Sequence, residues 1–390
     1  MTNQSIAIAI VGAGIGGVAL ALGLVRAGRS VRVYEQASAL GEVGAGISLS
    51  PNAVKGLRFL GLGDELEARA DEPLIMRTRE FSTGDVLVDI DRRNTREELG
   101  APYLQMHRAD LHALMVDALL ALDPDAVQLN KRFESVRAES GRYELFFTDG
   151  DSVVADLVVG ADGLKSSLRE QVFGESAPAF SGYVAWRGLL DRKLLGDYQL
   201  SEGSAVFIAP GRMFVRYPVR KGDVQNFVAF TKADDWAAEG WSQTGSTQEL
   251  RETFADFHEE VTTILGCYEN EQVHKWGLFA RHPIPHWVSG RITVLGDAAH
   301  PMLPWFGQGA ATSIEDAVVL ARSITEIDDI DDALRRYELG RRERVTQVHL
   351  ESQKGGERLT STDPRSLAKQ PVRTEDSLGI TLYDPATVAL

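Results

Sequence analysis

Short apolar runs alternate with segments of helical length over the first sixty residues. Residues 6–11 are a continuous apolar run, the pattern of a strand buried on both faces of a parallel sheet. Residues 18–26 form an apolar stretch of helical length, and residues 31–34 predict a second strand. Residues 41–52 are glycine-rich and predict a loop, and Pro51 then opens a predicted helix through residue 60. The pattern predicts a strand–helix–strand unit, whose crossover we expect to be right-handed.

Two further changes of pattern divide the rest of the chain. Residues 182–280 alternate with a period of two and concentrate aromatic side chains, which predicts an antiparallel sheet. Its expected strands span residues 183–190, 204–209, 213–219 and 226–231. Before this stretch we expect a helix over residues 108–122, short strands between residues 133 and 154, and a buried strand over residues 157–159. After it we expect a strand over residues 291–295 and helices over residues 307–324 and 330–348. The last helix carries Arg341, Arg342 and Arg344, which predict a solvated face.

Composition and charge narrow the classes of partner. The 390 residues include 41 basic and 56 acidic side chains, a net charge of -15, which disfavours nucleic acid and anionic membrane surfaces. Cys267 is the single cysteine, so we expect neither an intrachain disulfide nor a metal site. The apolar run at residues 6–11 lacks a basic start and is too short for a signal sequence or a membrane span. These features predict a cytoplasmic protein.

Between the first predicted strand and helix stands a glycine loop, Gly12-Ala13-Gly14-Ile15-Gly16-Gly17. In this position Gly12 permits a tight turn, Gly14 lets the backbone approach a pyrophosphate, and Gly17 permits close packing of the helix on the sheet. The helix N-terminus then presents N–H groups and a positive dipole end to the anion. Glu35, followed by Gln36, ends the second strand and can accept hydrogen bonds from a ribose diol. The loop predicts a site for FAD or NAD, and the alternative is a glycine-rich turn that binds no ligand.

Two later motifs resolve the choice between the nucleotides. The first follows the strand at residues 157–159 and reads Gly160-Ala161-Asp162-Gly163-Leu164-Lys165-Ser166-Ser167-Leu168-Arg169. The second follows the strand at residues 291–295 and reads Gly296-Asp297-Ala298-Ala299-His300-Pro301. With these motifs in this order, residues 6–348 resemble the single-component FAD-dependent aromatic hydroxylases, which include the p-hydroxybenzoate, salicylate, 3-hydroxybenzoate and 6-hydroxynicotinate hydroxylases.

The resemblance implies a p-hydroxybenzoate hydroxylase fold, an α/β architecture in which an antiparallel-sheet substrate domain is inserted into a Rossmann-like FAD-binding domain. The expected divisions are residues 1–178 and 283–354 for the FAD-binding domain, 179–282 for the substrate lobe, and 355–390 for an irregular C-terminal arm. It also implies tightly but non-covalently bound FAD, NADH or NADPH as a transient reductant, and O2 as co-substrate. The substrate would be a small phenolic or heteroaromatic ring, hydroxylated through a flavin C4a-hydroperoxide by a monomer or homodimer.

The same resemblance assigns the cofactor contacts. The residues expected to bind FAD are Gly12, Gly14, Gly17, Glu35, Gln36, Arg108, Asp162, Asp297, Gly307, Gly309 and Ala310. Arg108 matches an arginine that contacts the cofactor, and Asp297 matches an aspartate that binds the ribityl chain. Asp162 either serves the nucleotides or braces its own loop. Gly307 and Gly309 open a helix that points toward the flavin pyrimidine edge, where a helix N-terminus stabilises the anionic reduced form.

The ring pocket is expected against residues 212–218, where period-two alternation places Met213, Val215 and Tyr217 on one face. Tyr217 matches a pocket tyrosine of salicylate-type relatives, whereas Met213, Ser48 and Trp305 stand at or near positions where relatives carry histidine. The expected pocket residues are Ser48, Met213, Val215, Tyr217, Pro301, Trp305 and Phe306. The candidate catalytic residues are Tyr217 and His300, although His300 directly follows the aspartate motif, which is a structural or cofactor-side position.

Several functions stay open on this scaffold. A hydroxylase of the 6-hydroxynicotinate type, or of a larger polycyclic phenol, is an alternative within the family. An FAD-dependent isoprenoid reductase or epoxidase is a second alternative, and it predicts a long apolar tunnel. A non-catalytic binding protein that kept the FAD fold is a third.

Overall fold

The computed structural model describes residues 7–41, 45–174, 177–234, 236, 243–359 and 362–390. Within them, a central sheet has six strands in the order β18-β19-β11-β1-β2-β7. These strands are β1 (Ile8–Val11), β2 (Val31–Tyr34), β7 (Val127–Gln128), β11 (Leu157–Gly160), β18 (Val288–Ser289) and β19 (Ile292–Val294). Neighbouring strands are parallel except for the pair β18 and β19. Every residue of β1 and β11 is buried, as expected for a parallel sheet covered on both faces.

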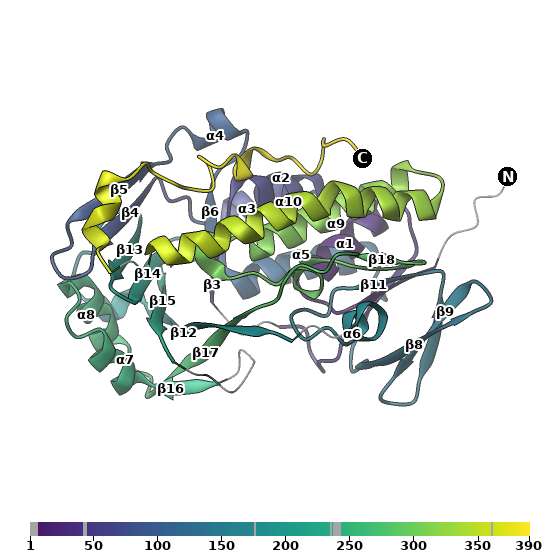
Figure 1. Cartoon of the computed structure of the whole chain (residues 1–390), viewed down its shortest axis with the longest axis horizontal. Helices are drawn as coiled ribbons and strands as arrows, with labels where there is room; N and C mark the ends of the chain where they lie inside the picture. The colour runs from purple at the N-terminus through teal and green to yellow at the C-terminus, as the bar shows by residue number, and fades with distance from the viewer. Residues whose placement is uncertain (1–6, 42–44, 175–176, 235, 237–242, 360–361) are drawn as a thin grey trace.

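Helix α1 packs on this sheet and further helices pack around α1, among which the long pair α9 and α10 runs side by side across the molecule (Figure 1). These helices are α1 (Ile15–Arg26), α2 (Pro51–Phe59), α3 (Gly63–Arg69), α5 (Arg108–Leu122), α9 (Gly309–Glu326) and α10 (Ile330–Leu359). The first ten residues of α1 are all buried because the helix lies between α5 and α9. The predicted bounds of β2 and α5 are confirmed. Ile6, the expected first residue of the first strand, lies outside the described residues.

A second, largely antiparallel sheet forms the other lobe. In the described part of the chain it has eight strands, in the order β16-β17-β12-β15-β14-β13-β4-β5. They are β4 (Ile75–Glu80), β5 (Val86–Asp91), β12 (Ala179–Asp191), β13 (Ser204–Ala209), β14 (Arg212–Val219), β15 (Val224–Lys232), β16 (Thr244–Ser246) and β17 (Gln272–Ala280). The four strands predicted between residues 183 and 231 are confirmed. Because β4 and β5 join this sheet from residues 75–91, its strands are not confined to residues 179–282.

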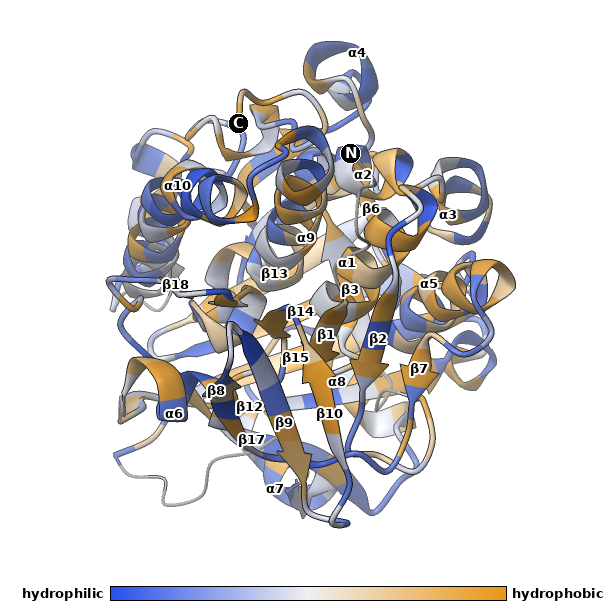
Figure 2. Ribbon diagram, turned by 90° about the vertical axis from the view of Figure 1, so that its right-hand side faces the viewer, coloured by the Kyte–Doolittle hydropathy of each residue, from blue (hydrophilic) through white to orange (hydrophobic). Residues whose placement is uncertain are grey.

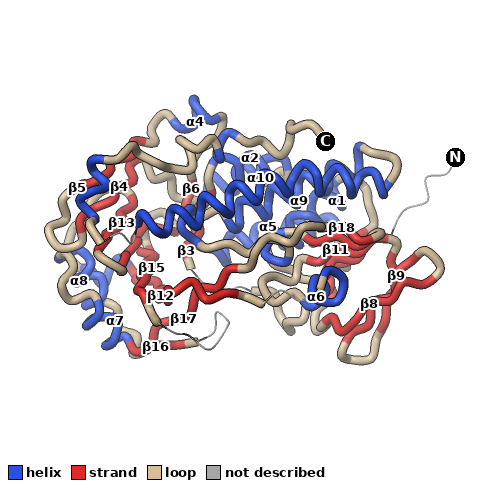
Figure 3. Tube along the Cα trace, in the orientation of Figure 1, coloured by secondary structure: helices blue, strands red, loops and turns tan. Residues whose placement is uncertain are grey.

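The two faces of the second sheet have different neighbours. Helices α7 (Thr247–Thr253) and α8 (Glu259–Cys267) lie against one face (Figure 3) and pack on Phe214 and Phe227. The opposite face carries Met213 and Phe230, and it packs against Trp305 from the loop before α9. The face that carries Met213 and Phe230 is therefore turned toward the lobe that contains the central parallel sheet.

Smaller elements connect the lobes. β3 (Gly46–Leu49) pairs antiparallel with β6 (Leu104–His107), so the prediction of a loop over residues 41–52 is wrong for residues 46–49; residues 42–44 lie outside the described residues. β8 (Phe133–Glu139), β9 (Arg142–Phe147) and β10 (Ser152–Ala155) form a separate three-stranded sheet, as the alternation predicts. Figure 2 shows hydrophobic residues along β1 and β7 and hydrophilic residues on α4 (Thr95–Leu99) at the surface. The remaining helical elements are α6 (Ser167–Phe173), η1 (Arg192–Leu195), η2 (Gly296–Ala298) and η3 (Pro304–Phe306).

Helix α10 continues to Leu359, beyond the predicted end at residue 348. The segment that follows it is an irregular arm (yellow in Figure 1). The arm contains two 3-10 turns, η4 (Pro364–Lys369) and η5 (Ile380–Leu382). Buried arginines fasten it: Arg92 Nη2 lies 2.8 Å from Glu375 Oε1, and Arg322 Nη1 donates to the carbonyl of Val388 at 2.8 Å.

Candidate active site

In the glycine loop before α1, two glycines lie tightly against backbone atoms and a third borders open space. Gly12 has φ +103°, and a Cβ there would lie 2.5 Å from the carbonyl oxygen of Ala161. A Cβ at Gly17 would lie 2.1 Å from the carbonyl oxygen of Gly12. At Gly14, no described atom outside the immediate neighbours comes within 4 Å of such a Cβ. The loop is therefore held against the β11 edge while Gly14 leaves room for a ligand to approach the backbone.

The first turn of α1 is suited to an anion. Gly14 is the N-cap residue and has no side chain with which to cap the helix, and the first turn contains no acidic residue. Its N–H groups and positive dipole end are the features that bind phosphate at helix starts. Glu35 fastens the loop, because its Oε2 accepts a hydrogen bond from Ala13 N and its Oε1 accepts one from Ala37 N, both at 2.8 Å. Gln36 is exposed beside it.

Asp162 borders the same loop, which also contacts α5 through His112 Nε2 and the carbonyl of Ala13. Asp162 braces its own turn, with Oδ1 accepting from Ser166 Oγ at 2.5 Å and Oδ2 from Leu168 N at 3.3 Å. Burial raises the pKa of Asp162. Arg108 is the first residue of α5, and its backbone N–H donates to the carbonyl of Ala45 at 2.7 Å. Of the two roles expected for Asp162, the loop-bracing one matches these contacts.

A second helix start, that of α9, has the same properties. Gly307 is left-handed at φ +63°, and Gln308 is the N-cap residue. The Gln308 side chain bonds to Ser50 and Asn52 instead of capping the helix. The first turn, from Gly309 through Ala310, contains no acidic residue. Two uncapped helix starts with glycine in the adjoining loops fit a cofactor that carries a pyrophosphate at one end and an anionic ring at the other, as FAD does.

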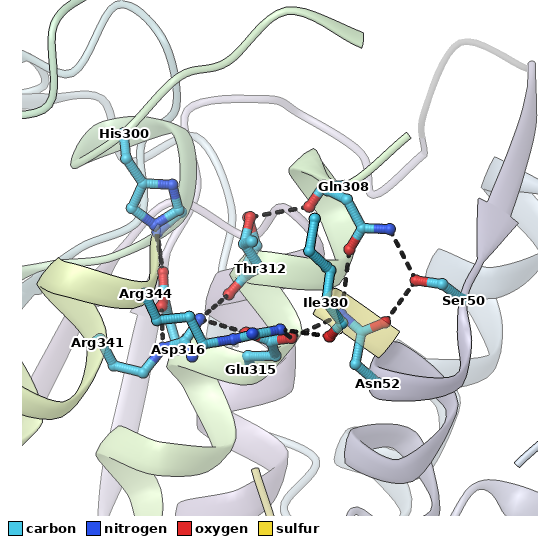
Figure 4. A network of polar contacts seen from close by, with 12 residues as sticks. Ser50, Asn52, His300, Gln308, Thr312, Glu315, Asp316, Arg341, Arg344 and Ile380 are labelled. Atoms are coloured by element: carbon cyan, nitrogen blue, oxygen red, sulfur yellow. Dashed lines mark hydrogen bonds and ion pairs between the residues drawn. The ribbon is translucent and has the colours of Figure 1, made fainter. Parts of the chain in front are cut away.

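A buried ionic cluster supports the start of α9 (Figure 4). Glu315 Oε2 lies 2.6 Å from Arg341 Nη2, and Asp316 Oδ1 lies 2.7 Å from Arg341 Nε. All three side chains are 0% exposed, so the predicted solvated face of α10 is wrong at Arg341. Arg344 also turns inward, with Nη2 2.7 Å from Glu315 Oε1. No local pattern in the sequence predicts this cluster, because its carboxylates and its arginines lie on different helices.

His300 belongs to the same cluster. Its Nε2 lies 2.5 Å from Asp316 Oδ2, and its ring stacks on Trp287 at a centroid distance of 5.1 Å. The side chain is buried, and its Nε2 atom is already engaged by a carboxylate. These contacts match the structural position noted from the sequence. Asp297 lies in the turn that follows β19 and precedes His300.

The expected wall of the ring pocket is the face of β14 that looks toward α9. Met213 and Val215 pack in one cluster with Trp305 and Phe230, and the rings of Trp305 and Phe230 lie 5.2 Å apart. Phe306 and Pro301 belong to the same loop between β19 and α9. A hollow of about 820 Å³ lies elsewhere, lined by Trp186, Arg212 and Lys275 among others. The shared cluster of Met213 and Val215 with Trp305 confirms the alternation predicted along β14.

The opposite face of β14 carries Arg216. Arg216 is buried against α8, with Nε 2.6 Å from Glu260 Oε1. This ion pair occupies the guanidinium, so Arg216 does not reach the face that carries Met213 and Tyr217.

Tyr217 lies at the edge where β14 meets β3. A Cβ added at Gly46 would lie 2.6 Å from the Tyr217 hydroxyl, which shows how closely the two strands approach. Burial raises the pKa of Tyr217, and a hydrogen bond with Ser48 opposes part of the shift. Tyr103, which the sequence analysis missed, also interacts with Ser48, and burial raises the pKa of its phenol. Ser48 therefore stands between two neutral tyrosines.

Two classes of feature are absent from the described residues. No group of three or more His, Cys, Asp or Glu side chains among them is placed to hold a metal ion. No helix found in the described ranges is long and apolar enough to cross a membrane.

Comparisons with known proteins agree with an FAD site at the starts of α1 and α9. Residues 5–352 match the family described as an FAD binding domain. The chain is 36% identical to the 6-hydroxynicotinate 3-monooxygenase of Pseudomonas fluorescens, over 93% of this chain and 94% of that protein. It is 37% identical to the 3-amino-4-hydroxybenzoate 2-monooxygenase PtmB3 of Streptomyces platensis, over 91% and 89%. The crystal structure of Klebsiella pneumoniae HpxO complexed with FAD and uric acid has a TM-score of 0.84 and 28% identity, and the match covers 98% of this chain and 97% of that one.

These matches extend over nearly the whole chain and include the glycine loop, the Asp297 motif and the inserted sheet. The chain therefore belongs to the single-component FAD-dependent aromatic hydroxylases and is an FAD-dependent monooxygenase.

Proposed function

We propose that this protein uses NADH or NADPH and O2 to hydroxylate a phenolic or heteroaromatic ring that lies between the flavin and β14. The observation that carries the proposal is the cluster of Met213, Val215, Phe230 and Trp305. It is an apolar, aromatic wall placed directly before the α9 start, which we assign to the flavin. A planar ring gains dispersion and aromatic contacts on such a wall, and the wall excludes water.

The two helix starts divide the binding of FAD between them. We assign the pyrophosphate to the N–H groups around Gly14 and the pyrimidine edge of the ring system to the α9 start at Gly309. Asp297 and Arg108 are assigned to the ribityl chain and the adjoining cofactor oxygens. When bound, FAD supplies the hydride acceptance and oxygen activation that the reaction needs. The positive end of α9 favours the anionic reduced form of that cofactor.

Tyr217 and Ser48 are assigned to the oxygen substituent of the substrate. Because burial raises the pKa of Tyr217, its phenol stays protonated at neutral pH. It is therefore a hydrogen-bond donor toward a phenolate oxygen and a poor base. The pair orients the hydroxylated ring and stabilises its deprotonated form.

Two relatives narrow the substrate class. One acts on 6-hydroxynicotinate and the other on 3-amino-4-hydroxybenzoate, and both names describe a single ring with a hydroxyl and a carboxylate. We infer a small hydroxylated ring of this kind for the present chain, with a larger polycyclic phenol as the alternative. We also place the protein in the cytoplasm as a monomer or homodimer, in keeping with its single cysteine.

The test is a screen of hydroxybenzoates, hydroxypyridines and polycyclic phenols with the purified holoenzyme. We expect one class to accelerate NAD(P)H oxidation and to yield a product with one added oxygen, detected by mass spectrometry. Flavin that is reduced normally while no ring gains oxygen would contradict the proposal. A protein that purifies without flavin absorbance would instead support a non-catalytic binding role, and turnover of an isoprenoid would support the reductase or epoxidase alternative.

A further inference from the structure

Two adjacent residues of α9 carry fully buried charges. Burial would raise the pKa values of Glu315 and Asp316, but nearby cations lower them, and His300 and Arg341 hold the pKa of Asp316 at about 2. Both carboxylates are therefore ionised at neutral pH. Buried ion pairs recover their desolvation cost only in part, so stability alone is a weak reason to keep them. What the two carboxylates hold in place is more informative.

Asp316 holds the turn that follows β19. Its Oδ2 accepts a hydrogen bond from His300 Nε2 at 2.5 Å (Figure 4). The same oxygen accepts one from Gly296 N at 3.0 Å, so it binds both ends of the turn. The turn also lies tightly on α9, because a Cβ at Gly296 would lie 2.6 Å from Ser313 Oγ. Asp297 lies within this turn. The position of the Asp297 backbone is thus set by Asp316.

Glu315 holds the start of α9 by a different route. Its Oε1 accepts a hydrogen bond from Asn52 Nδ2 at 2.6 Å, and the same amide group lies 3.1 Å from Gln308 Oε1. Ser50 Oγ closes the ring, 2.6 Å from Asn52 Oδ1 and 3.0 Å from Gln308 Nε2 (Figure 4). Gln308 immediately precedes the first residue of α9. Glu315 therefore fixes the helix start through one side chain of α2.

We propose that Asp316 and Glu315 are positioning residues with separate tasks, Asp316 for the Asp297 turn and Glu315, through Asn52, for the α9 start. Successive helix residues point about 100° apart, which lets neighbours on one helix reach two segments. The proposal rests on the cofactor placement proposed above. It predicts that the two carboxylates affect different properties of the bound FAD.

The experiment compares Asp316→Asn with Glu315→Gln in the holoenzyme. We expect Asp316→Asn to release FAD at least about tenfold faster on dilution, followed by flavin fluorescence, because the ribityl contact moves. We expect Glu315→Gln to stabilise the reduced flavin about tenfold less, because the positive helix end shifts away from the ring. For a two-electron couple that is a potential lower by about 30 mV, measured by spectroelectrochemistry. Each variant should leave the other property close to that of the wild type.

Glu326→Gln is the matched control, because Glu326 is a half-exposed carboxylate on the same helix that pairs with Arg322 at 2.9 Å. It should change neither FAD release nor potential. The proposal is overturned if Asp316→Asn and Glu315→Gln only lower the melting temperature, or if both change the same flavin property to the same extent.

Two milder variants keep the proposal testable if a charge-removing variant does not fold. His300→Phe keeps the ring stack on Trp287 and removes one bond to Asp316, so it should accelerate FAD release. Asn52→Ala leaves the ion pairs intact and cuts the link from Glu315 to Gln308, so it should lower the potential. Unchanged flavin properties in both would overturn the proposal. None of these readouts needs a substrate, so a failure to hydroxylate any ring would count against the proposed function alone.

Discussion

The starts of α1 and α9, which we assign to the two ends of FAD, are held in place by different kinds of contact. Each presents an uncapped helix N-terminus with glycine in its loop and no acid in its first turn. The α1 start is fixed by backbone contacts within a six-residue loop, since Gly17 lies against the carbonyl of Gly12. The α9 start is fixed by side chains from α2, α9 and α10, including Asn52 and Arg341. The first start should therefore be sensitive to added volume, and the second to lost charge.

Arg341→Met should give the largest effect at the α9 start. It removes the guanidinium that Glu315 and Asp316 share and leaves buried carboxylates short of a partner. We expect a loss of about 3–5 kcal/mol in the free energy of unfolding, measured by denaturant titration with FAD bound. A loss below about 1 kcal/mol would show that the cluster is not the support of this helix.

Gly17→Ala should give the next largest effect, at the α1 start. The new Cβ would meet a backbone oxygen at 2.1 Å, so the helix must shift away from the loop. We expect a cost of about 3 kcal/mol, the upper end for overpacking, together with loss of FAD. The matched control is Gly14→Ala, whose Cβ meets open space among the described residues and should weaken FAD binding without a comparable loss of stability. Equal destabilisation by both variants would contradict the comparison.

Acid should weaken the α9 start in a defined pH window. The pKa of Asp316 is held at about 2, below its usual 3.8, so its contribution is complete above pH 4 and disappears as the pH falls through 2. We expect the stability advantage of the wild type over Asp316→Asn, of the order of 2 kcal/mol, to stay constant from pH 7 to 5 and to vanish near pH 2. An advantage that does not change across this range would show that the charge of Asp316 is not what stabilises the cluster.

Glu326→Gln should give the smallest effect. Glu326 is half-exposed, and the buried Arg322 keeps its hydrogen bonds to the carbonyls of Pro385 and Val388 when the carboxylate is lost. Ion pairs between residues four apart on a helix contribute about 0.3–0.5 kcal/mol. Thermal unfolding should show a change of this size. A larger loss would mean that any charge on α9 matters, which would remove the contrast with Glu315 and Asp316.

The contrast between contacts within one segment and contacts between distant segments also explains how much of the fold and of the site the sequence predicts. The strand at residues 31–34, the helix at residues 108–122 and the glycine loop follow from local period and from glycine spacing, which the chain carries within each segment. The charged side chains at 341 and 344 follow the same helical period, yet Arg341 is buried and Arg344 is only partly exposed because their partners lie on α9. A helix pattern tells which residues share a face, and it does not tell what covers that face.

The pocket side shows the same limit. The face that carries Met213 and Val215 follows from alternation along β14. Tyr103 was missed because its link to Ser48 depends on the pairing of β3 with β6, and the glycines before Ile47 predicted a loop there. Likewise, β4 and β5 join a sheet whose other strands begin some hundred residues later. Long-range strand pairing is decided by tertiary contacts that local propensity does not encode.

The order of strands in the central sheet also bears on how the chain is made. β1 is one of the two innermost strands, and its neighbour β11 also pairs with β19, so the sheet is complete only after residues 292–294 have left the ribosome. Contacts so distant in sequence form slowly, and partly built sheets expose unpaired edges meanwhile. The α9 start waits longer still, for Arg341 and Arg344. During synthesis, the α1 start, which we assign to the pyrophosphate, can be shaped well before the α9 start, which we assign to the flavin ring.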